Sequence, residues 1–490
     1  MMPSRFIPLL AAAIATLGAV SAHAASSRDP AAKSSAPSRV FKAGAATSNI
    51  TPNIGAAIVG GWSPAPSKHI HDDLHARCLA LDDGNTKLVF VVVDSVSVPR
   101  EVLDAAKRLV QEETGLSPDN QMMSATHTHS APSSRGANSL VFGAPFDDYQ
   151  KFVVRRIADG VRRALNNLEP ARIGWSSGQV PQHLFNRRSL LKNGKTATNP
   201  FGGQDRVVTN QRSHPDRLKA AGPTNSEVYF ISVQSTNGRP IGLLANYWLH
   251  YVGGGPSGQI SADYFGMFCE RIQQLLGANV QRPPFVGILA NGPCGDVNNI
   301  GAVTPPGVKY APGDKMRLIA DDVAHEVARV HRTLTFHDWV ELKAAQAELE
   351  LKMRQPTPEL VQRAQQILAR PANTSPNHVR ELSYAQRTMD ARNWPETVSI
   401  VMQTFRIGGL GVAAIPFETF TETGLEIKAK SPFKDTFTIE LANGGLGYLP
   451  TPEQHELGGY ETWLGTSRVE QEASRQIVAK LLELFAQIKP

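Results

Sequence analysis

Strand-like and helix-like stretches alternate along this chain from Phe41 onward, and the alternation limits the fold more than any other feature of the sequence. KLVFVVVD at 87–94 is an apolar run typical of a buried strand. REVLDAAKRLVQEETG at 100–115 has the spacing of an amphipathic helix closed by glycine. Such alternation produces sheets with helices on their faces. We therefore predict an α/β fold with mixed β-sheets flanked by helices.

Three later regions refine this expectation. SEVYFISVQS and IGLLANYWLH flank the turn TNGRP and predict a β-hairpin. Residues 191–225 are rich in Gly, Asn, Pro and Arg and longer than a plain connection, so we expect them to cover or shape a site. Residues 340–395 are mostly helical in pattern and predict a helical insertion, followed by further strands and a C-terminal helix at 467–488.

The N-terminus carries an export signal. Arg5 precedes an apolar stretch too short to span a bilayer comfortably, and Ala-His-Ala at 22–24 is a small-x-small cleavage site. Residues 1–24 therefore predict a signal peptide, and the Ser-, Ala- and Pro-rich residues 25–39 predict a disordered linker. No later stretch is apolar enough for a membrane helix, so we expect no integral membrane span and a periplasmic or secreted location.

Charge and cysteine content narrow the class of protein. The net charge is +6, and because Lys and Arg are spread among acidic residues, a nucleic-acid partner has little support. The three cysteines, Cys78, Cys269 and Cys294, allow one disulfide at most. An apolar content of 41% is enough for a proper core, so the chain is expected to be globular.

The stretch SATHTHSAP at 124–132 is the first candidate for chemistry. If the segment is extended, the side chains of His127 and His129 point to one face and can converge on a shared ligand. Imidazole is the commonest metal ligand in proteins. The alternative is a pair of histidines satisfied by backbone hydrogen bonds, and this motif alone leaves both open.

Other polar residues follow apolar strands. His250 meets the glycine-rich YVGGGPSG, where backbone can approach a ligand, although it could equally be a core histidine near a turn. ILANGPCGDVNN ends in a turn that presents Cys294 and Asn298, with a purely structural turn as the alternative. Glu418 directly follows a strand, an unusual place for a carboxylate unless it is paired or bound to a cation.

Seven stretches in this order resemble the neutral/alkaline non-lysosomal ceramidase family: AGAATSNITP, DDLHARCLAL, SATHTHSAP, NYWLH, GDV followed by Asn, IPFETFTETG and GYLPTPEQHELGGYE. They extend from Phe41 to about Trp463. Members of that family are zinc amidases, and the resemblance implies a Zn²⁺ site with four ligands: His127, His250, Glu418 and Tyr448. Nitrogen and oxygen ligands around an open position suit catalytic zinc.

The resemblance also implies catalytic roles. His129 corresponds to a partner of the substrate carbonyl or of bound water, and Arg187 in FNRRS to a carbonyl or oxyanion contact. Tyr460 resembles another active-site tyrosine. Where the family has serine in GDVSPN, this chain has Asn298, which can hydrogen-bond a substrate but cannot serve as a serine-like nucleophile.

Besides Asn298, the domain organisation of this chain also differs from that of the family. Family members continue into an immunoglobulin-like C-terminal domain, whereas a helix ends this chain soon after GGYETWLGTSRVE. We therefore expect residues 40–490 to form one ceramidase-like catalytic domain without that C-terminal domain.

The function implied is an exported zinc-dependent amidohydrolase of lipid metabolism that cleaves an N-acyl amide, ceramide or a ceramide-like compound, by zinc-activated water. Its partner would be a small-molecule N-acyl amide or lipid. Two alternatives stay open because fold does not fix chemistry. One is a zinc-dependent esterase or other hydrolase on the same scaffold, and the other is a non-catalytic envelope binding protein stabilised by the metal.

Overall fold

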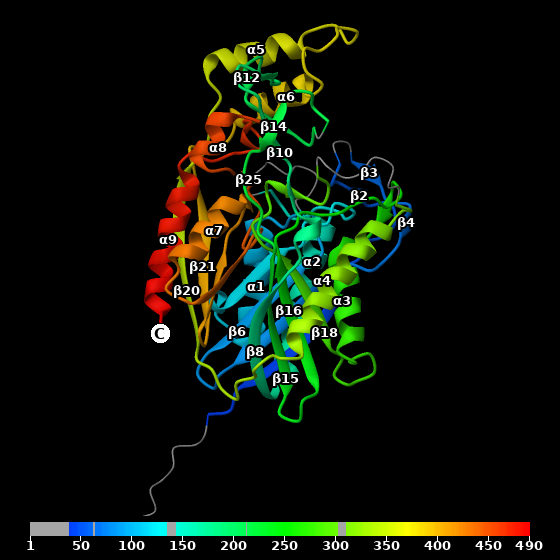
Figure 1. Cartoon of the computed structure of the whole chain (residues 1–490), viewed down its shortest axis with the longest axis vertical. Helices are drawn as coiled ribbons and strands as arrows, with labels where there is room; N and C mark the ends of the chain where they lie inside the picture. The colour runs from blue at the N-terminus through cyan, green and yellow to red at the C-terminus, as the bar shows by residue number, and fades with distance from the viewer. Residues whose placement is uncertain (1–38, 62–63, 135–143, 212, 302–309) are drawn as a thin grey trace, which may run out of the picture. The chain divides into compact units, whose positions relative to one another are not determined.

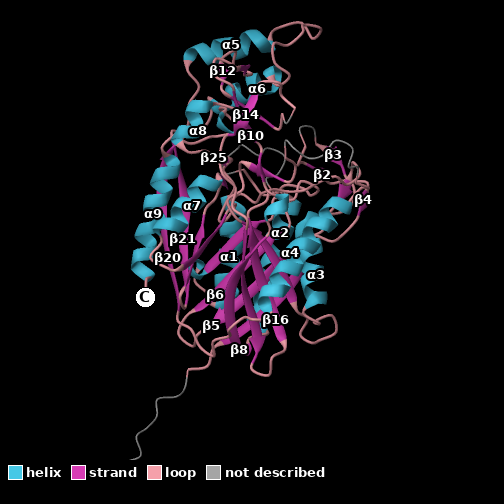
Figure 2. Cartoon of the chain, viewed as in Figure 1, coloured by secondary structure: helices cyan, strands magenta, loops and turns pink. Residues whose placement is uncertain are grey.

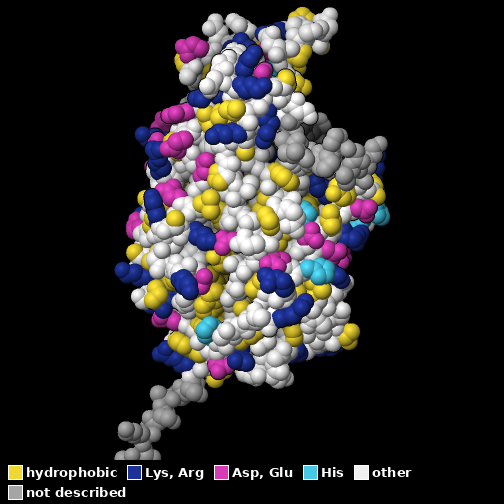
Figure 3. Space-filling model, viewed as in Figure 1, with side chains coloured by type: hydrophobic (Ala, Val, Ile, Leu, Met, Phe, Trp, Pro, Cys, Tyr) yellow, Lys and Arg dark blue, Asp and Glu magenta, His cyan; other side chains and the backbone are white. Residues whose placement is uncertain are grey.

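A computed structural model describes residues 39–61, 64–134, 144–211, 213–301 and 310–490. The expected signal peptide and nearly all of the expected linker lie outside these described residues. No helix within the described ranges combines the length and the apolar character needed to cross a membrane. On the face drawn in Figure 3, Lys and Arg side chains lie scattered among Asp and Glu.

The largest element is an eight-stranded mixed sheet. Its parallel pairs, β16 with β18 and β6 with β7, lie at the two edges, and the pairs between them are antiparallel. The hairpin predicted from sequence is confirmed as β15 and β16. The strands in spatial order are β18 (Val286–Asn291), β16 (Pro240–Tyr247), β15 (Glu227–Ser235), β8 (Glu169–Gln179), β1 (Lys42–Asn49), β5 (His75–Asp82), β6 (Lys87–Val93) and β7 (Gln121–Ala125).

A second sheet of four strands packs against one face of the first. Its strands are β20 (Leu342–Lys352), β21 (Thr397–Ile407), β22 (Leu410–Ala414) and β24 (Asp435–Ile439). Successive side chains of β6 point to opposite faces of the sheet. Phe90 packs in the core between the two sheets, and Val91 packs in the core between the large sheet and its helices. Phe90 and Phe405 meet across the sheets with ring centroids 5.2 Å apart.

Helices cover the outer faces of both sheets (Figures 1 and 2). The large sheet shares buried apolar clusters with α1 and α2 on one half and with α3 and α4 on the other, and α9 lies along β20 and β21 of the second sheet. The mixed α/β prediction is therefore confirmed. The bounds are α1 Arg100–Thr114, α2 Asp148–Asn166, α3 Asp263–Leu275, α4 Asp314–His331, α7 Thr421–Lys430, α8 Pro452–Leu457 and α9 Ala473–Ile488.

The predicted α1 ends where the sequence indicated, at Gly115, whose φ of 74° is left-handed. The predicted helical insertion at 340–395 is wrong in its first third, because β20 is a strand. LKAAQAELELK contains good helix formers, but continuous pairing with β21 along eleven residues overrides that propensity. The helical part is limited to α5 (Pro358–Leu368) and α6 (Glu381–Ala391).

The region at 191–225 contains several short strands. The strands β10 (Arg188–Leu191), β13 (Val207–Thr209) and β14 (Arg217–Ala220) form one small sheet, and β11 (Ala197–Thr198) pairs with β12 (Gln204–Asp205). In Figure 1 the labelled strands β10, β12 and β14 lie with α5 and α6 above β25 (Tyr448–Leu449). All three cysteines are buried and free, so none forms a disulfide.

Candidate active site

The two histidines of SATHTHSAP lie just beyond the carboxyl end of β7. His127 has a left-handed backbone (φ 65°), so the prediction of an extended segment is wrong at this residue. The backbone N–H of His127 donates to the carbonyl oxygen of Ser95, which fixes the turn. The two imidazoles still meet, with Nε2 of His127 and Nε2 of His129 3.0 Å apart. Convergence therefore comes from a turn and not from strand alternation.

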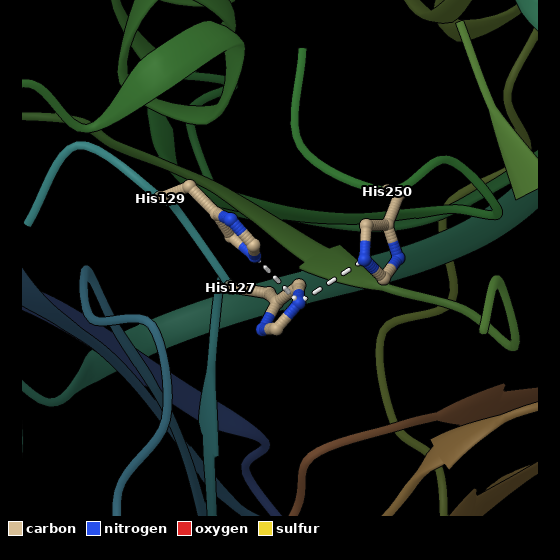
Figure 4. A group of neighbouring side chains, drawn as sticks. All are labelled: His127, His129 and His250. Atoms are coloured by element: carbon tan, nitrogen blue, oxygen red, sulfur yellow. Dashed lines mark hydrogen bonds between the residues drawn. The ribbon is translucent and has the colours of Figure 1, made fainter. Parts of the chain in front are cut away.

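His250 follows β16 and brings a third imidazole to the same point (Figure 4). Its Nε2 lies 3.1 Å from Nε2 of His127. The Nδ1 of His127 donates to the carbonyl oxygen of Val96 at 2.7 Å, and the Nδ1 of His250 lies 3.7 Å from Sγ of Cys294. A neutral imidazole carries one proton, so protons held at Nδ1 leave both Nε2 atoms as lone-pair acceptors.

Glu418 adds a carboxylate to these two nitrogens. Its Oε2 lies 3.4 Å from Nε2 of His127 and 3.7 Å from Nε2 of His250, and it is buried without a hydrogen-bond partner. Tyr448 donates a hydrogen bond to the Glu418 carboxylate. Glu418 and Tyr448 are register partners in the short parallel pair of β23 (Glu418–Thr419) and β25.

This donor set fits a divalent cation. Two lone-pair nitrogens and an unpartnered carboxylate oxygen repel one another at 3.1–3.7 Å unless a positive charge lies among them. Zinc with ligands at about 2.0–2.1 Å would place neighbouring ligand atoms about 3 Å apart, close to the separations of these side chains. His127, His129 and His250 also form a cluster close enough to bind an ion. The residues present are therefore suited to zinc.

His129 lies against an aromatic ring that sequence reasoning missed. Tyr251 stacks on His129 with ring centroids 3.5 Å apart and planes 10° apart. Burial, and then the neighbouring His127, lower the pKa of His129 well below its usual value, so this imidazole is neutral at pH 7. The only signal for Tyr251 in the sequence is an aromatic residue directly after His250.

Arg187 reaches the site from the loop before β10. Its Nε donates to Glu461 at 2.8 Å, its guanidinium lies 5.2 Å from the ring centroid of Tyr448, and its Nη2 is buried without a hydrogen-bond partner. Burial opposes the charge, but Tyr448 and Glu461 outweigh it and raise the pKa of Arg187. Tyr460 packs edge-on against Tyr448 at 5.6 Å. Glu461 was not predicted, although it directly follows Tyr460 in the sequence.

Asn298 is the predicted site residue that the structure does not bring to the histidines through any described contact. It lies in β19 (Val297–Asn298), which pairs with β9 (Phe185–Asn186). Its Nδ2 donates to Oδ1 of Asn210 at 2.6 Å, and its Oδ1 accepts from the backbone of Ile300. The backbone N–H of Asn210 in turn donates to the carbonyl oxygen of Arg187. Asn298 is therefore connected to the site indirectly, through Asn210. A substrate contact by Asn298 stays a prediction.

Fold and site together define a mixed α/β protein with a candidate metal centre at its strand ends. The family described as "Neutral/alkaline non-lysosomal ceramidase, N-terminal" matches residues 41–306, more than half of the chain. The chain belongs to this family.

Two solved structures share the fold. The crystal structure of neutral ceramidase from Pseudomonas aeruginosa is similar with a TM-score of 0.68 and 18% sequence identity, covering 92% of this chain and 74% of that one. A structure described as ceramidase complexed with C2 is similar with a TM-score of 0.67 and 16% identity, covering 92% and 75%. At these identities the likeness supports the fold.

Proposed function

We propose that this protein is an exported zinc-dependent amidohydrolase that cleaves an N-acyl amide, with ceramide or a ceramide-like compound as the substrate class. The observation that carries the proposal is the convergence of His127, His250 and Glu418 on one point, where three buried acceptors lack a positive partner. Family membership supports hydrolysis of an amide. Residues 1–24, with their signal-peptide pattern, support export to the periplasm or the medium.

Four side chains would hold the metal: His127, His250, Glu418 and Tyr448. Zinc bound there would supply Lewis-acid polarisation of the scissile carbonyl and lower the pKa of water. The Nδ1 contacts of the two histidines keep their Nε2 atoms turned toward the site. The hydrogen bond between Tyr448 and Glu418 keeps these two oxygen donors side by side.

His129 is placed to move the proton. Its Nε2 faces the cluster 3.0 Å from Nε2 of His127, and its lowered pKa leaves it free to accept a proton from attacking water. The same imidazolium then donates to the departing amine nitrogen. Tyr251 restricts the ring of His129 by stacking on one of its faces.

Arg187 is placed to stabilise charge on the substrate. It stays cationic, and its buried Nη2 has hydrogen-bonding capacity that no described residue uses. A carbonyl oxygen gains negative charge as water attacks it, and a fixed guanidinium stabilises that charge. Glu461 holds the opposite side of Arg187, so the cation is oriented before substrate arrives.

The test is turnover by purified protein on a panel of N-acyl amides that includes ceramide, with matched esters, measuring release of the amine or alcohol. Zinc-free enzyme, zinc-reloaded enzyme and the variant His129→Gln are compared. We expect amide cleavage that depends on zinc and falls by about 10²–10⁴-fold in the variant. Full activity in zinc-free protein would refute zinc dependence, faster ester cleavage would favour the esterase alternative, and zinc binding without turnover would favour a binding protein.

A further inference from the structure

Behind His250, on the Nδ1 side of its ring, lie two buried groups that the proposed reaction does not use. Cys294, in the turn after β18, has its Sγ 3.7 Å from Nδ1 of His250. The thiol donates to Oε1 of Glu440 at 3.0 Å. Cys294 and Glu440 are both 0% exposed, and His250 is 1% exposed. The three side chains form a hydrogen-bonded row that ends at the candidate metal centre.

The second oxygen of Glu440 ties this row to another ligand. Oε2 accepts the backbone N–H of Thr419 at 2.8 Å and that of Cys294 at 3.2 Å. Thr419 directly follows Glu418, so the carboxyl group of Glu440 contacts the backbone next to Glu418 as well as the thiol next to His250. The backbone N–H of Glu440 in turn donates to Asn291, at the end of β18. Glu440 thus joins the ends of β18, β23 and β24.

Two other roles for this cluster fit the contacts less well. A nucleophilic thiol needs a lowered pKa, whereas burial, and then Glu440, raise the pKa of Cys294. A second cation could be bound by His250, Cys294 and Glu440, whose ligand atoms lie close together. However, the oxygens of Glu440 already accept three hydrogen bonds, so this cluster lacks an unpartnered acceptor such as Oε2 of Glu418.

We propose that Cys294 and Glu440 are positioning residues that orient His250, with its Nδ1 toward Cys294 and its Nε2 toward the cation site. The inference rests on the metal centre of the proposed function. In this arrangement Glu440 fixes the thiol rotamer. The sulfur of Cys294 and its backbone carbonyl, which accepts a hydrogen bond from His250, together fix the tautomer and tilt of the imidazole. The lone pair of Nε2 then points toward the cation site. Partners of this kind behind a metal ligand typically contribute 10–100-fold to metal affinity.

The experiment measures zinc affinity by competition with a chromophoric chelator, independently of turnover. We expect Cys294→Ala and Glu440→Gln to raise the Kd for zinc by about 10–100-fold. Cys294→Ser keeps a donor beside Glu440 and should recover part of the loss. Cys78→Ala, which removes a buried free thiol from β5, is the matched control and should leave the Kd unchanged.

A second readout separates positioning from loss of fold. Cobalt(II) loaded into the same proteins reports ligand geometry through its visible spectrum, and circular dichroism reports the fold. An altered cobalt spectrum in Cys294→Ala or Glu440→Gln, with an unchanged circular dichroism spectrum, would support positioning. If one variant does not fold, the other, together with Cys294→Ser, still decides.

Three outcomes would overturn the inference. Unchanged zinc affinity in folded Cys294→Ala and Glu440→Gln would refute it while leaving the proposed function intact. Two zinc ions per wild-type chain, with one lost in these variants, would make Cys294 and Glu440 ligands instead. Wild-type protein with no affinity for zinc would refute the proposed function, and this inference with it.

Discussion

The buried carboxylate of Glu461 provides a sharp test of how Arg187 is held. Glu461 is fully buried and accepts from Nε of Arg187 at 2.8 Å and from Nη1 of Arg188 at 2.7 Å. The hydroxyl of Thr209 donates to the same carboxylate. Glu461→Gln keeps the shape of the side chain but leaves two buried guanidinium groups without their negative partner.

The size of the effect follows from this burial. Removing one member of a buried ion pair typically costs about 3–5 kcal/mol. Unfolding entropy is about 2.1 cal/mol/K per residue, so for the roughly 450 residues from Arg39 to Pro490 the melting temperature should fall by about 3–5 °C at pH 7. Glu483→Gln, which removes the partner of Lys480 at the surface, is the control and should leave the melting temperature unchanged.

The stability that Glu461 contributes should depend on pH in a defined direction. Burial opposes the charge on Glu461, but Arg187 and Arg188 outweigh it and lower the pKa of this carboxyl in the folded protein. A carboxyl with a lowered pKa contributes stability above its unfolded pKa of about 4.3 and loses it as pH falls through the folded pKa. Calorimetry should therefore show a constant gap between wild type and Glu461→Gln from pH 5 to 8 that narrows below about pH 4. Equal melting temperatures at pH 7, or a gap that widens in acid, would refute the reasoning.

Two further predictions concern His129. In Gly60→Ala the new Cβ would lie 2.2 Å from the carbonyl oxygen of His129, so the loop must shift and kcat/KM should fall by about 100-fold. Gly255→Ala, whose Cβ meets a flexible Gln259 side chain, is its control, and equal rates for the two variants would contradict the prediction. Stacking by Tyr251 is worth about 0.5–1.5 kcal/mol, so kcat/KM should fall by about 2–13-fold in Tyr251→Ala but less than twofold in Tyr251→Phe. Loss of activity in the Phe variant would instead assign a role to the hydroxyl.

Much of the fold could be predicted because local pattern and tertiary position agree. β6, α1 and the hairpin of β15 and β16 carry apolar spacing that matches the faces they bury. β20 could not be predicted, because its Ala-, Glu- and Lys-rich sequence favours a helix and only pairing with β21 makes it a strand. The bend at His127 was also out of reach, since the contact that sets it comes from Ser95.

The site residues also fall into those that the sequence pattern indicated and those that it did not. His127, His250 and Glu418 stand at the ends of apolar strands, where a polar residue is conspicuous, and the structure brings them within 3.1–3.7 Å of one another. Glu440 also directly follows a strand, β24, but its role could not be predicted, because its partner Cys294 lies 146 residues away in the sequence. Tyr251 and Glu461 were equally hidden, since an aromatic residue or an acid beside a motif has no assigned partner until the chain is folded.

Diffraction at the zinc absorption edge, from crystals of protein purified without added chelator, tests the central claim most directly. We expect one anomalous peak per chain, within about 2.0–2.2 Å of Nε2 of His127 and His250 and of a carboxylate oxygen of Glu418, with the Tyr448 oxygen as the fourth protein ligand. A crystal without this peak after zinc is supplied, or a peak located elsewhere in the chain, would contradict the assignment.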